Sequence, residues 1–519
     1  MPVVPSEPIA QLADAWRACV GTGRMGLSLR QGHIDAVKKA VADIGFQSIR
    51  GHGMFHEDMG IIKVSEVSGE RVVRYSFLYL DQVIDSYLQA GVTPLLELGF
   101  MPEVLASGDD TVFWWKGNIT PPADYDAWCE LVQVTLRHLI DRYGADEVVS
   151  WPIEVWNEPN LTVFWKDANQ DEYFRLYERT ARAIKAVDAR FQVGGPVLSP
   201  GSDHWWAPFI AFIERTGAPI DFVSRHAYTS GPAEHVPFGV YQTLREPQHL
   251  IDQFAIPSAE LKGTALEGLP VHVSEYNTSY RPDNPVHDTA YNAAYLAPVL
   301  ACGGSTGVAS FSYWTVSDVF EEEGVPRALF HGGFGLLTHG NIPKPTYHLF
   351  AFMAAMGTDI LSTGDDHLVT RHPDGHIALL AWHPVTGQSA TPTSGHTVNL
   401  SIPLDPTTAP TAGAHTPGQP APASAAYVSR QRVNDTLGNA FTAWQTMGRP
   451  PAPTRQQMRH LHLAATPHHT VTTHDITNSR VDLTLTLDRH EITLVELTAT
   501  TNATEPWTDD TRIPGHATA

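Results

Sequence analysis

The sequence has few cysteines, an excess of acidic over basic residues, and no long apolar segment. Its 519 residues include only Cys19, Cys129 and Cys302, an odd and small number that argues against a disulfide framework and fits a reducing compartment. No run of about 18 or more apolar residues occurs, so we expect no membrane span. The N-terminus has neither a basic segment nor a long apolar one, so we expect no secretory signal and a cytoplasmic location.

The charge balance bears on the kind of partner the chain binds. There are 56 acidic and 34 basic residues, which give a formal net charge of −22. This charge opposes binding to nucleic acid and to anionic membranes, and it favours a neutral substrate. Histidine is frequent, with 26 residues, but the pairs His460/His462 and His468/His469 lack the spacing of a Cys/His metal site. We therefore expect no metal and no other cofactor.

Residues from about 20 to 350 alternate short apolar runs with amphipathic stretches. The runs predict eight strands, at residues 19–25, 45–50, 93–98, 149–156, 191–194, 220–224, 271–274 and 308–313. Between them lie helical patterns with apolar residues at spacings of three or four, as from Phe174 to Val187. This alternation predicts an α/β fold, a (β/α)8 TIM barrel. A doubly wound sheet is the alternative, but it would usually have fewer units and a glycine-rich phosphate turn.

The pattern changes after about residue 355. Residues 367–370, 376–382, 396–402 and 481–487 alternate polar and apolar positions, as antiparallel strands do. We therefore predict a catalytic barrel at residues 15–355 and an accessory β-sandwich-like domain at residues 356–500, which residues 1–14 could join. Residues 409–426, rich in Ala, Pro, Thr and Gly, predict a long loop within it. Residues 501–519 are expected to form a loose tail.

Two glutamates follow or close predicted barrel strands. Glu158 lies in the sequence Trp156-Asn157-Glu158-Pro159-Asn160, directly after the fourth predicted strand, and Glu275 closes the seventh. In a TIM barrel the active site forms at the C-terminal ends of the strands. Two carboxyl groups at that end are what glycoside hydrolysis needs, one to hold a proton and one ionised beside the sugar carbon.

Several further segments carry a resemblance to a known family. They are IRGHG at 49–53, FWWKGN at 113–118, EVWNEPNLTVFW at 154–165, SRHAY at 224–228, VSEYNTSY at 273–280, SYWTVSDVFEE at 312–322 and FHGGFGLL at 330–337. Together they resemble glycoside hydrolase family 39, the β-xylosidase and α-L-iduronidase family. The resemblance covers about 480 residues, including a β-domain around residues 430–448.

The resemblance implies a retaining double displacement with named roles. Glu158 would be the general acid/base and Glu275 the nucleophile. Asn157 would hydrogen-bond the sugar 2-hydroxyl, and Arg50 would keep the nucleophile ionised. The other residues that it implies for the sugar pocket are His52, His226, Tyr228, Tyr280, Trp314, Glu322 and Trp114, with Trp314 as the apolar floor under the sugar ring.

Two other classes of function remain as alternatives. The sequence Gly303-Gly304-Ser305-Thr306-Gly307 matches the G-x-S-x-G elbow of esterases, which should follow a strand and open a helix. Here it follows an apparent helix and precedes a strand, so we interpret it as a tight turn. A non-catalytic carbohydrate-binding protein would usually lack one of the two carboxylates.

The sugar is the more open question. The segments at 113–118 and 312–322 resemble bacterial β-xylosidases, and the acidic chain disfavours anionic glycosaminoglycans. We therefore expect an exo-acting β-xylosidase that releases xylose from the non-reducing end of xylo-oligosaccharides. An α-L-iduronidase, α-L-arabinosidase or β-glucosidase specificity is the alternative, because Gly51 and Arg225 depart from the pattern of some relatives. The expected partner is a small oligosaccharide or glycoside, and self-association into a homo-oligomer is a further hypothesis.

Overall fold

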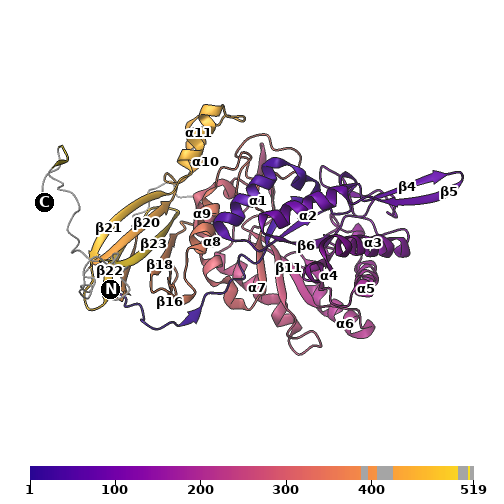
Figure 1. Ribbon diagram of the computed structural model, residues 1–519, viewed down its shortest axis with the longest axis horizontal. Coiled ribbons are helices and arrows are strands. Elements are labelled where there is room, and N and C mark those ends of the chain that lie inside the picture. Colours follow the sequence, from indigo (N-terminus) through magenta and orange to yellow (C-terminus); the bar gives the residue numbers. More distant parts are fainter. Residues whose placement is uncertain (387–394, 406–424, 501–511, 515–519) are drawn as a thin grey trace. The chain divides into compact units, whose positions relative to one another are not determined.

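Eight parallel strands close into a barrel in the computed structural model, which describes residues 1–386, 395–405, 425–500 and 512–514 (Figure 1). In sequence order the strands are β2 (Val20–Arg24), β3 (Ser48–His52), β6 (Thr93–Leu98), β9 (Ile153–Val155), β10 (Val193–Leu198), β11 (Phe222–Tyr228), β14 (Val271–Asn277) and β15 (Ser310–Tyr313). Each pairs with its neighbours in sequence, and β15 closes the ring on β2. The predicted TIM barrel is confirmed.

Helices alternate with these strands and present an apolar face to them. They are α1 (Gln31–Ile44), α2 (Leu78–Ala90), α3 (Tyr125–Tyr143), α4 (Ala145–Val148), α5 (Gln170–Val187), α6 (Trp206–Thr216), α7 (Pro247–Leu261), α8 (Ala290–Cys302) and α9 (Pro345–Ala354). In α1 the buried residues Ala36, Val37, Ala40 and Ile44 recur at helical spacing. The helix ends at Gly45, whose φ of 84° is the left-handed conformation that favours glycine at a C-terminus.

Seven of the eight barrel strands differ in extent from their predicted ranges, and the fourth and fifth show the physical reasons. The fourth strand, β9, covers only 153–155, because residues 145–148 form α4 and Pro152 precedes the strand. The fifth, β10, runs on through Gly194-Gly195-Pro196 to Leu198. Glycine is required at 194, because a Cβ there would overlap the ring of Phe222 on the neighbouring strand. Gly194 therefore allows β10 and β11 to pack closely.

Short hairpins extend from the barrel at the connections. They are β4 (Ile62–Val67) with β5 (Glu70–Tyr75), β7 (Thr111–Val112) with β8 (Gly117–Asn118), and β12 (Glu234–Val236) with β13 (Gly239–Tyr241). In Figure 1 the β4–β5 hairpin projects well away from the barrel strands. No helix among the described residues is long and apolar enough to cross a membrane.

The remaining strands are antiparallel. A seven-stranded sheet has the order β1 (Ala10–Gln11), β16 (Asp359–Thr363), β17 (His367–Arg371), β18 (Ile377–His383), β23 (Glu491–Thr500), β20 (Ala425–Val433) and β21 (His468–Asp475). A second sheet pairs β19 (His396–Pro403) with β22 (Arg480–Leu487). Leu379 and Val495 from the first sheet share one apolar core with Leu400 and Leu483 from the second. This arrangement is a β-sandwich core.

The chain divides into two compact units that differ from the predicted ranges in one segment. One unit contains residues 1–12, 355–432 and 467–519, and the other contains residues 13–354 and 433–466. Residues 433–466, which we placed in the β-domain, thus belong to the barrel unit. They form α10 (Ala440–Thr446) and α11 (Arg455–Ala464), whose Trp444 and Leu461 pack with Leu329 and Phe330.

Two predicted segments lie largely outside the described residues. The loop expected at 409–426 lies outside the described residues except for its last two residues, which belong to β20. The tail expected at 501–519 does so except for residues 512–514.

Candidate active site

The backbone after β9 fixes the position of Glu158. Trp156 and Glu158 have φ angles of 73° and 40°, in the left-handed region that non-glycine residues seldom adopt. Val197 in β10 has a φ of 57°, and its carbonyl accepts a hydrogen bond of 3.1 Å from the Glu158 N–H. Unfavourable backbone conformations of this kind concentrate at functional sites, where the surrounding structure enforces them.

Asn160 ties the same turn to the loop after β10. Its side-chain oxygen accepts from the Ser199 N–H at 3.0 Å, and its amide nitrogen donates to the hydroxyls of Ser199 and Ser202. The last residue of the motif that contains Glu158 thus anchors it.

Glu275 in β14 is surrounded by groups that stabilise a negative charge. Arg50 Nη1 donates to Glu275 Oε1 at 2.8 Å, and the Tyr228 hydroxyl donates to Oε2 at 2.7 Å. His52 Nε2 lies 3.6 Å from Oε1. The structure therefore places Arg50 and Tyr228 in direct contact with this carboxylate.

Arg50 is fully buried and also contacts two further carboxylates. Its Nε donates to Glu154 Oε2 at 2.6 Å, and its Nη2 lies 2.9 Å from Glu97 Oε2 and donates to Asn157 Oδ1 at 3.0 Å. Glu97 also contacts His52 Nδ1 at 2.6 Å. A buried guanidinium needs such partners, because an unpaired charge in the interior costs several kcal/mol. Glu97 and Glu154 thus fix the orientation of Arg50.

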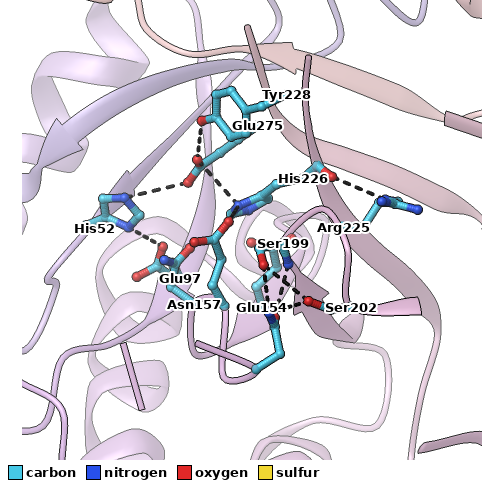
Figure 2. A network of polar contacts seen from close by, with 12 residues as sticks. His52, Glu97, Glu154, Asn157, Ser199, Ser202, Arg225, His226, Tyr228 and Glu275 are labelled. Atoms are coloured by element: carbon cyan, nitrogen blue, oxygen red, sulfur yellow. Dashed lines mark hydrogen bonds and ion pairs between the residues drawn. The ribbon is translucent and has the colours of Figure 1, made fainter. Parts of the chain in front are cut away.

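His226 lies between Glu158 and Glu275. Its Nδ1 is 2.8 Å from Glu158 Oε1. It is 3.4 Å from Glu275 Oε2, a contact that Figure 2 shows. These two oxygens are therefore no farther apart than the sum of the two distances. That limit is below the separation of about 6.5–9.5 Å that inverting glycosidases use to admit a water molecule. The spacing favours retention.

The two carboxyl groups differ in how readily they ionise. Burial, with the negative charge of Glu275, raises the pKa of Glu158 well above its usual range. Burial also raises the pKa of Glu275, but Arg50, His52 and the hydroxyl of Tyr228 oppose that rise. Burial lowers the pKa of His226 well below its usual range, as do the nearby cations Arg50 and Arg225, so its imidazole is neutral. Glu158 is therefore the group that keeps its proton and Glu275 the one that loses it.

Aromatic rings line the site next to these groups. Trp314, at the end of β15, lies 4.8 Å from the ring of His52 and 5.9 Å from the guanidinium carbon of Arg50. Phe113 lies 6.3 Å from the ring of His52 and packs on Trp115. The structure thus places Trp314 beside His52 and Arg50, the two residues that contact Glu275 from β3.

Three predicted residues remain: Tyr280, Trp114 and Glu322. The Tyr280 side chain is 43% exposed, and its hydroxyl accepts from the Ala233 N–H while its ring meets that of Tyr228 edge-on. Trp114 is 56% exposed and turned outward, so Phe113 and Trp115, not Trp114, pack beside His52 and Phe100. The Tyr280 hydroxyl thus contacts the backbone of Ala233, and the neighbouring Tyr228 is the tyrosine that donates to Glu275.

Glu322 is the third. Burial, together with the negative charges of Glu275, Glu323 and Glu158, raises its pKa well above its usual range. Its carboxyl group therefore favours the neutral form, which both donates and accepts hydrogen bonds, as a sugar hydroxyl requires.

The esterase-like sequence does not form a nucleophile elbow. Gly303–Thr306 is a 3-10 turn that follows α8 and precedes β15, and the Ser305 hydroxyl donates to the Cys302 carbonyl on the surface. An esterase serine would instead lie on a strand-to-helix turn.

A TIM barrel with two strand-end carboxyl groups of unequal pKa, one held by a guanidinium, defines a glycoside hydrolase. Residues 2–480 match the family model for glycosyl hydrolases family 39. The chain belongs to this family.

Named relatives agree with this assignment. A β-xylosidase of Geobacillus stearothermophilus is 45% identical over 519 residues, which cover 99% of each chain. The crystal structure of a monomeric β-xylosidase from Caulobacter crescentus CB15 matches with a TM-score of 0.84 at 29% identity, covering 96% of this chain and 100% of that one. Human α-L-iduronidase is 27% identical over 199 residues, which cover 36% of this chain and 28% of its own.

Proposed function

We propose that this protein is a retaining exo-β-xylosidase that releases xylose from the non-reducing end of short xylo-oligosaccharides. The observation that carries the proposal is the asymmetry of the carboxyl pair: Arg50 and Tyr228 bind Glu275, whereas neutral His226 is the group that contacts Glu158. The sugar is inferred from the β-xylosidase relative that matches over nearly the full length of both chains.

The geometry supports a double displacement. Glu275 attacks the anomeric carbon while protonated Glu158 donates its proton to the departing oxygen. The resulting ester removes the negative charge of Glu275, which is one of the two main causes of the high pKa of Glu158. Glu158 then accepts a proton from the water that cleaves the ester. Asn157, held by Arg50, lies beside the nucleophile and would bind the 2-hydroxyl.

The charges around the site favour a neutral sugar over a uronic acid. A uronate would need a free cation, but Arg50 is committed to Glu97, Glu154 and Glu275. Arg281, which acts electrostatically on Glu322, is itself paired with Asp283 and Glu323. The engagement of Arg50 and Arg281 with other carboxylates therefore disfavours an α-L-iduronidase activity.

One substrate panel tests the proposal. Aryl β-xyloside, α-L-arabinoside, β-glucoside and α-L-iduronide are assayed side by side, and NMR identifies the anomer first released. We expect the β-xyloside to have the highest kcat/KM and to yield β-xylose first. A higher kcat/KM on another glycoside would overturn the sugar assignment, and an inverted product would overturn the mechanism. Glu275→Ala, which removes the nucleophile, should abolish turnover.

A further inference from the structure

A buried cluster of charges forms where the connection between β15 and α9 meets the 3-10 turn Pro285–Asp288 that precedes α8. Lys344 Nζ is 2.7 Å from Asp288 Oδ1 and 2.7 Å from Asp318 Oδ2, and it donates to the Gly333 carbonyl at 2.8 Å. All three side chains are at most 1% exposed. We call Lys344, Asp288 and Asp318 the Lys344 cluster. Burial of three charges without solvent is costly, so their mutual contacts are strongly required.

The Lys344 cluster holds the segment His331-Gly332-Gly333-Phe334-Gly335. Asp288 Oδ2 accepts from the Gly332 N–H at 2.7 Å, and Asp318 Oδ1 accepts from the Gly335 N–H at 2.8 Å. A Cβ at Gly333 would overlap the Asp318 carboxylate, and one at Gly335 would overlap the Asp318 backbone. The glycines therefore let this segment approach the buried charges, and they account for the sequence motif there.

From this segment a chain of ring contacts leads to the sugar site. Phe334 meets Phe320 edge-on at 5.3 Å, and Phe320 meets Trp314 edge-on at 5.9 Å. Trp314 in turn lies 4.8 Å from the ring of His52. These three aromatic residues form a buried group of their own. Trp314 also packs closely on Gly21, where a Cβ would overlap its indole. The ring of Trp314 is thus held from the barrel on one side and from Phe320 on the other.

We propose that Lys344 is a positioning residue for the reaction, and that it acts by holding Trp314 in place through Asp318, Phe334 and Phe320. Asp318 lies in the same connection as Trp314 and Phe320. The cluster therefore fixes the segment that carries Phe334 and also the segment that carries Trp314. The proposal rests on the proposed function only in that Trp314 is taken to contact the sugar.

A double-mutant cycle between Lys344 and Trp314 tests this. Lys344→Met removes the charge but keeps the chain length, and Trp314→Phe removes the larger ring. The kcat and KM of wild type, both single variants and the double variant are measured on an aryl β-xyloside below the melting temperature of each. Residues that act through one another show non-additive effects. We expect Lys344→Met to lower kcat/KM about tenfold in the wild-type background but about twofold or less in the Trp314→Phe background.

Lys185→Met is the matched control. Lys185 Nζ lies 2.8 Å from Asp221 and donates to the Phe191 carbonyl, at the end of the barrel where β10 begins. Its loss should lower the melting temperature without a change in kcat/KM in either background. If Lys344→Met does not fold, Asp318→Asn/Lys344→Met takes its place, because it removes one positive and one negative charge together.

The results separate the proposal from the proposed function. Equal losses from Lys344→Met in both Trp314 backgrounds, or no loss of kcat/KM, would overturn the positioning role. An inactive wild type on β-xyloside would instead overturn the proposed function, and the cycle would then be run on the glycoside that the panel identifies.

Discussion

At the scale of single residues, the proton on Glu158 governs the chemistry. Burial and the negative charge of Glu275 raise the pKa of Glu158 and so keep this proton in place. His226 Nδ1 contacts Glu158 Oε1 at 2.8 Å. Protonation of the leaving oxygen matters most when that oxygen is a poor leaving group.

This dependence predicts how Glu158→Ala behaves. The variant should lose about 10²–10⁴-fold in kcat/KM on xylobiose, the range that general acid catalysis supplies. It should lose far less in the first step on an aryl xyloside with a good leaving group, since that group departs without a proton. Steady-state and pre-steady-state kinetics on both substrates check this. Equal losses on the two would contradict the acid/base role.

The raised pKa of Glu158 also destabilises the folded protein at neutral pH. A carboxyl group whose pKa is higher in the folded than in the unfolded protein destabilises the fold once the pH exceeds its unfolded pKa. Stability then falls as pH rises from the ordinary glutamate pKa of 4.5 toward the raised pKa of Glu158 in the folded protein. The contribution is absent below that window, where Glu158 is protonated in both states.

Glu158→Gln therefore should raise the melting temperature at pH 7, by about 1–4 °C. The gain should vanish near pH 4, because wild-type Glu158 is then uncharged as well. Thermal melts of both proteins across this pH range measure the difference. A gain that is the same at pH 4 and pH 7 would show that packing, not charge, causes it.

At the scale of elements, apolar runs that end in polar residues predicted the barrel strands and the two glutamates that follow or close them. Glu97 and Glu154 were missed, because each lies inside an apolar run and neither is needed to explain that run. The signal that could have found them is a carboxylate within a buried strand, which needs a cation such as Arg50. Which cation the carboxylate meets depends on the register between β3, β6 and β9. The pattern of apolar runs in the sequence does not reveal that register.

The loops at the strand ends were harder to predict. Trp114 and Trp115 are adjacent and chemically alike, yet only Trp115 packs against Phe100, while Trp114 is exposed. The difference follows from positive φ angles at Phe113 and Lys116, which reverse the chain around them. Sequence spacing does not reveal such a reversal.

The anchoring of the Glu158 turn can be tested at Asn160. Asn160→Ala removes the contacts to Ser199 and Ser202 and leaves those groups without their partner. We expect a loss of about 1–3 kcal/mol in the free energy of unfolding. We also expect a lower kcat with a smaller change in KM, since Glu158 shifts while the sugar-binding groups stay. An unchanged kcat at full folding would show that the turn is held without Asn160.

At the scale of the whole molecule, each of the two units is built from segments that are separated in the sequence by segments of the other unit. Residues 433–466 lie between strands of the β unit in sequence but belong to the barrel unit. Conversely, Val4 belongs to the β unit, where its N–H donates to the Ser401 carbonyl at 2.9 Å and its side chain is 1% exposed. Helical periodicity could predict α10 and α11, but not the unit on which their apolar faces pack.

Two core variants follow from this division, one for each unit. Trp444→Ala removes a 7% exposed ring that contacts Phe330 and Phe441 in the barrel unit, and should cost about 3–5 kcal/mol there. Val4→Asp places a charge in the apolar core of the β unit. Because all catalytic residues lie in the barrel unit, Trp444→Ala should bring loss of activity on heating to a lower temperature. Val4→Asp should leave kcat/KM at 25 °C unchanged while lowering the temperature of a calorimetric transition.

Two outcomes would show that the division into these two units does not describe how the protein unfolds. One is a lower kcat/KM of Val4→Asp at a temperature where the protein is folded. The other is heat inactivation of Trp444→Ala at the same temperature as wild type.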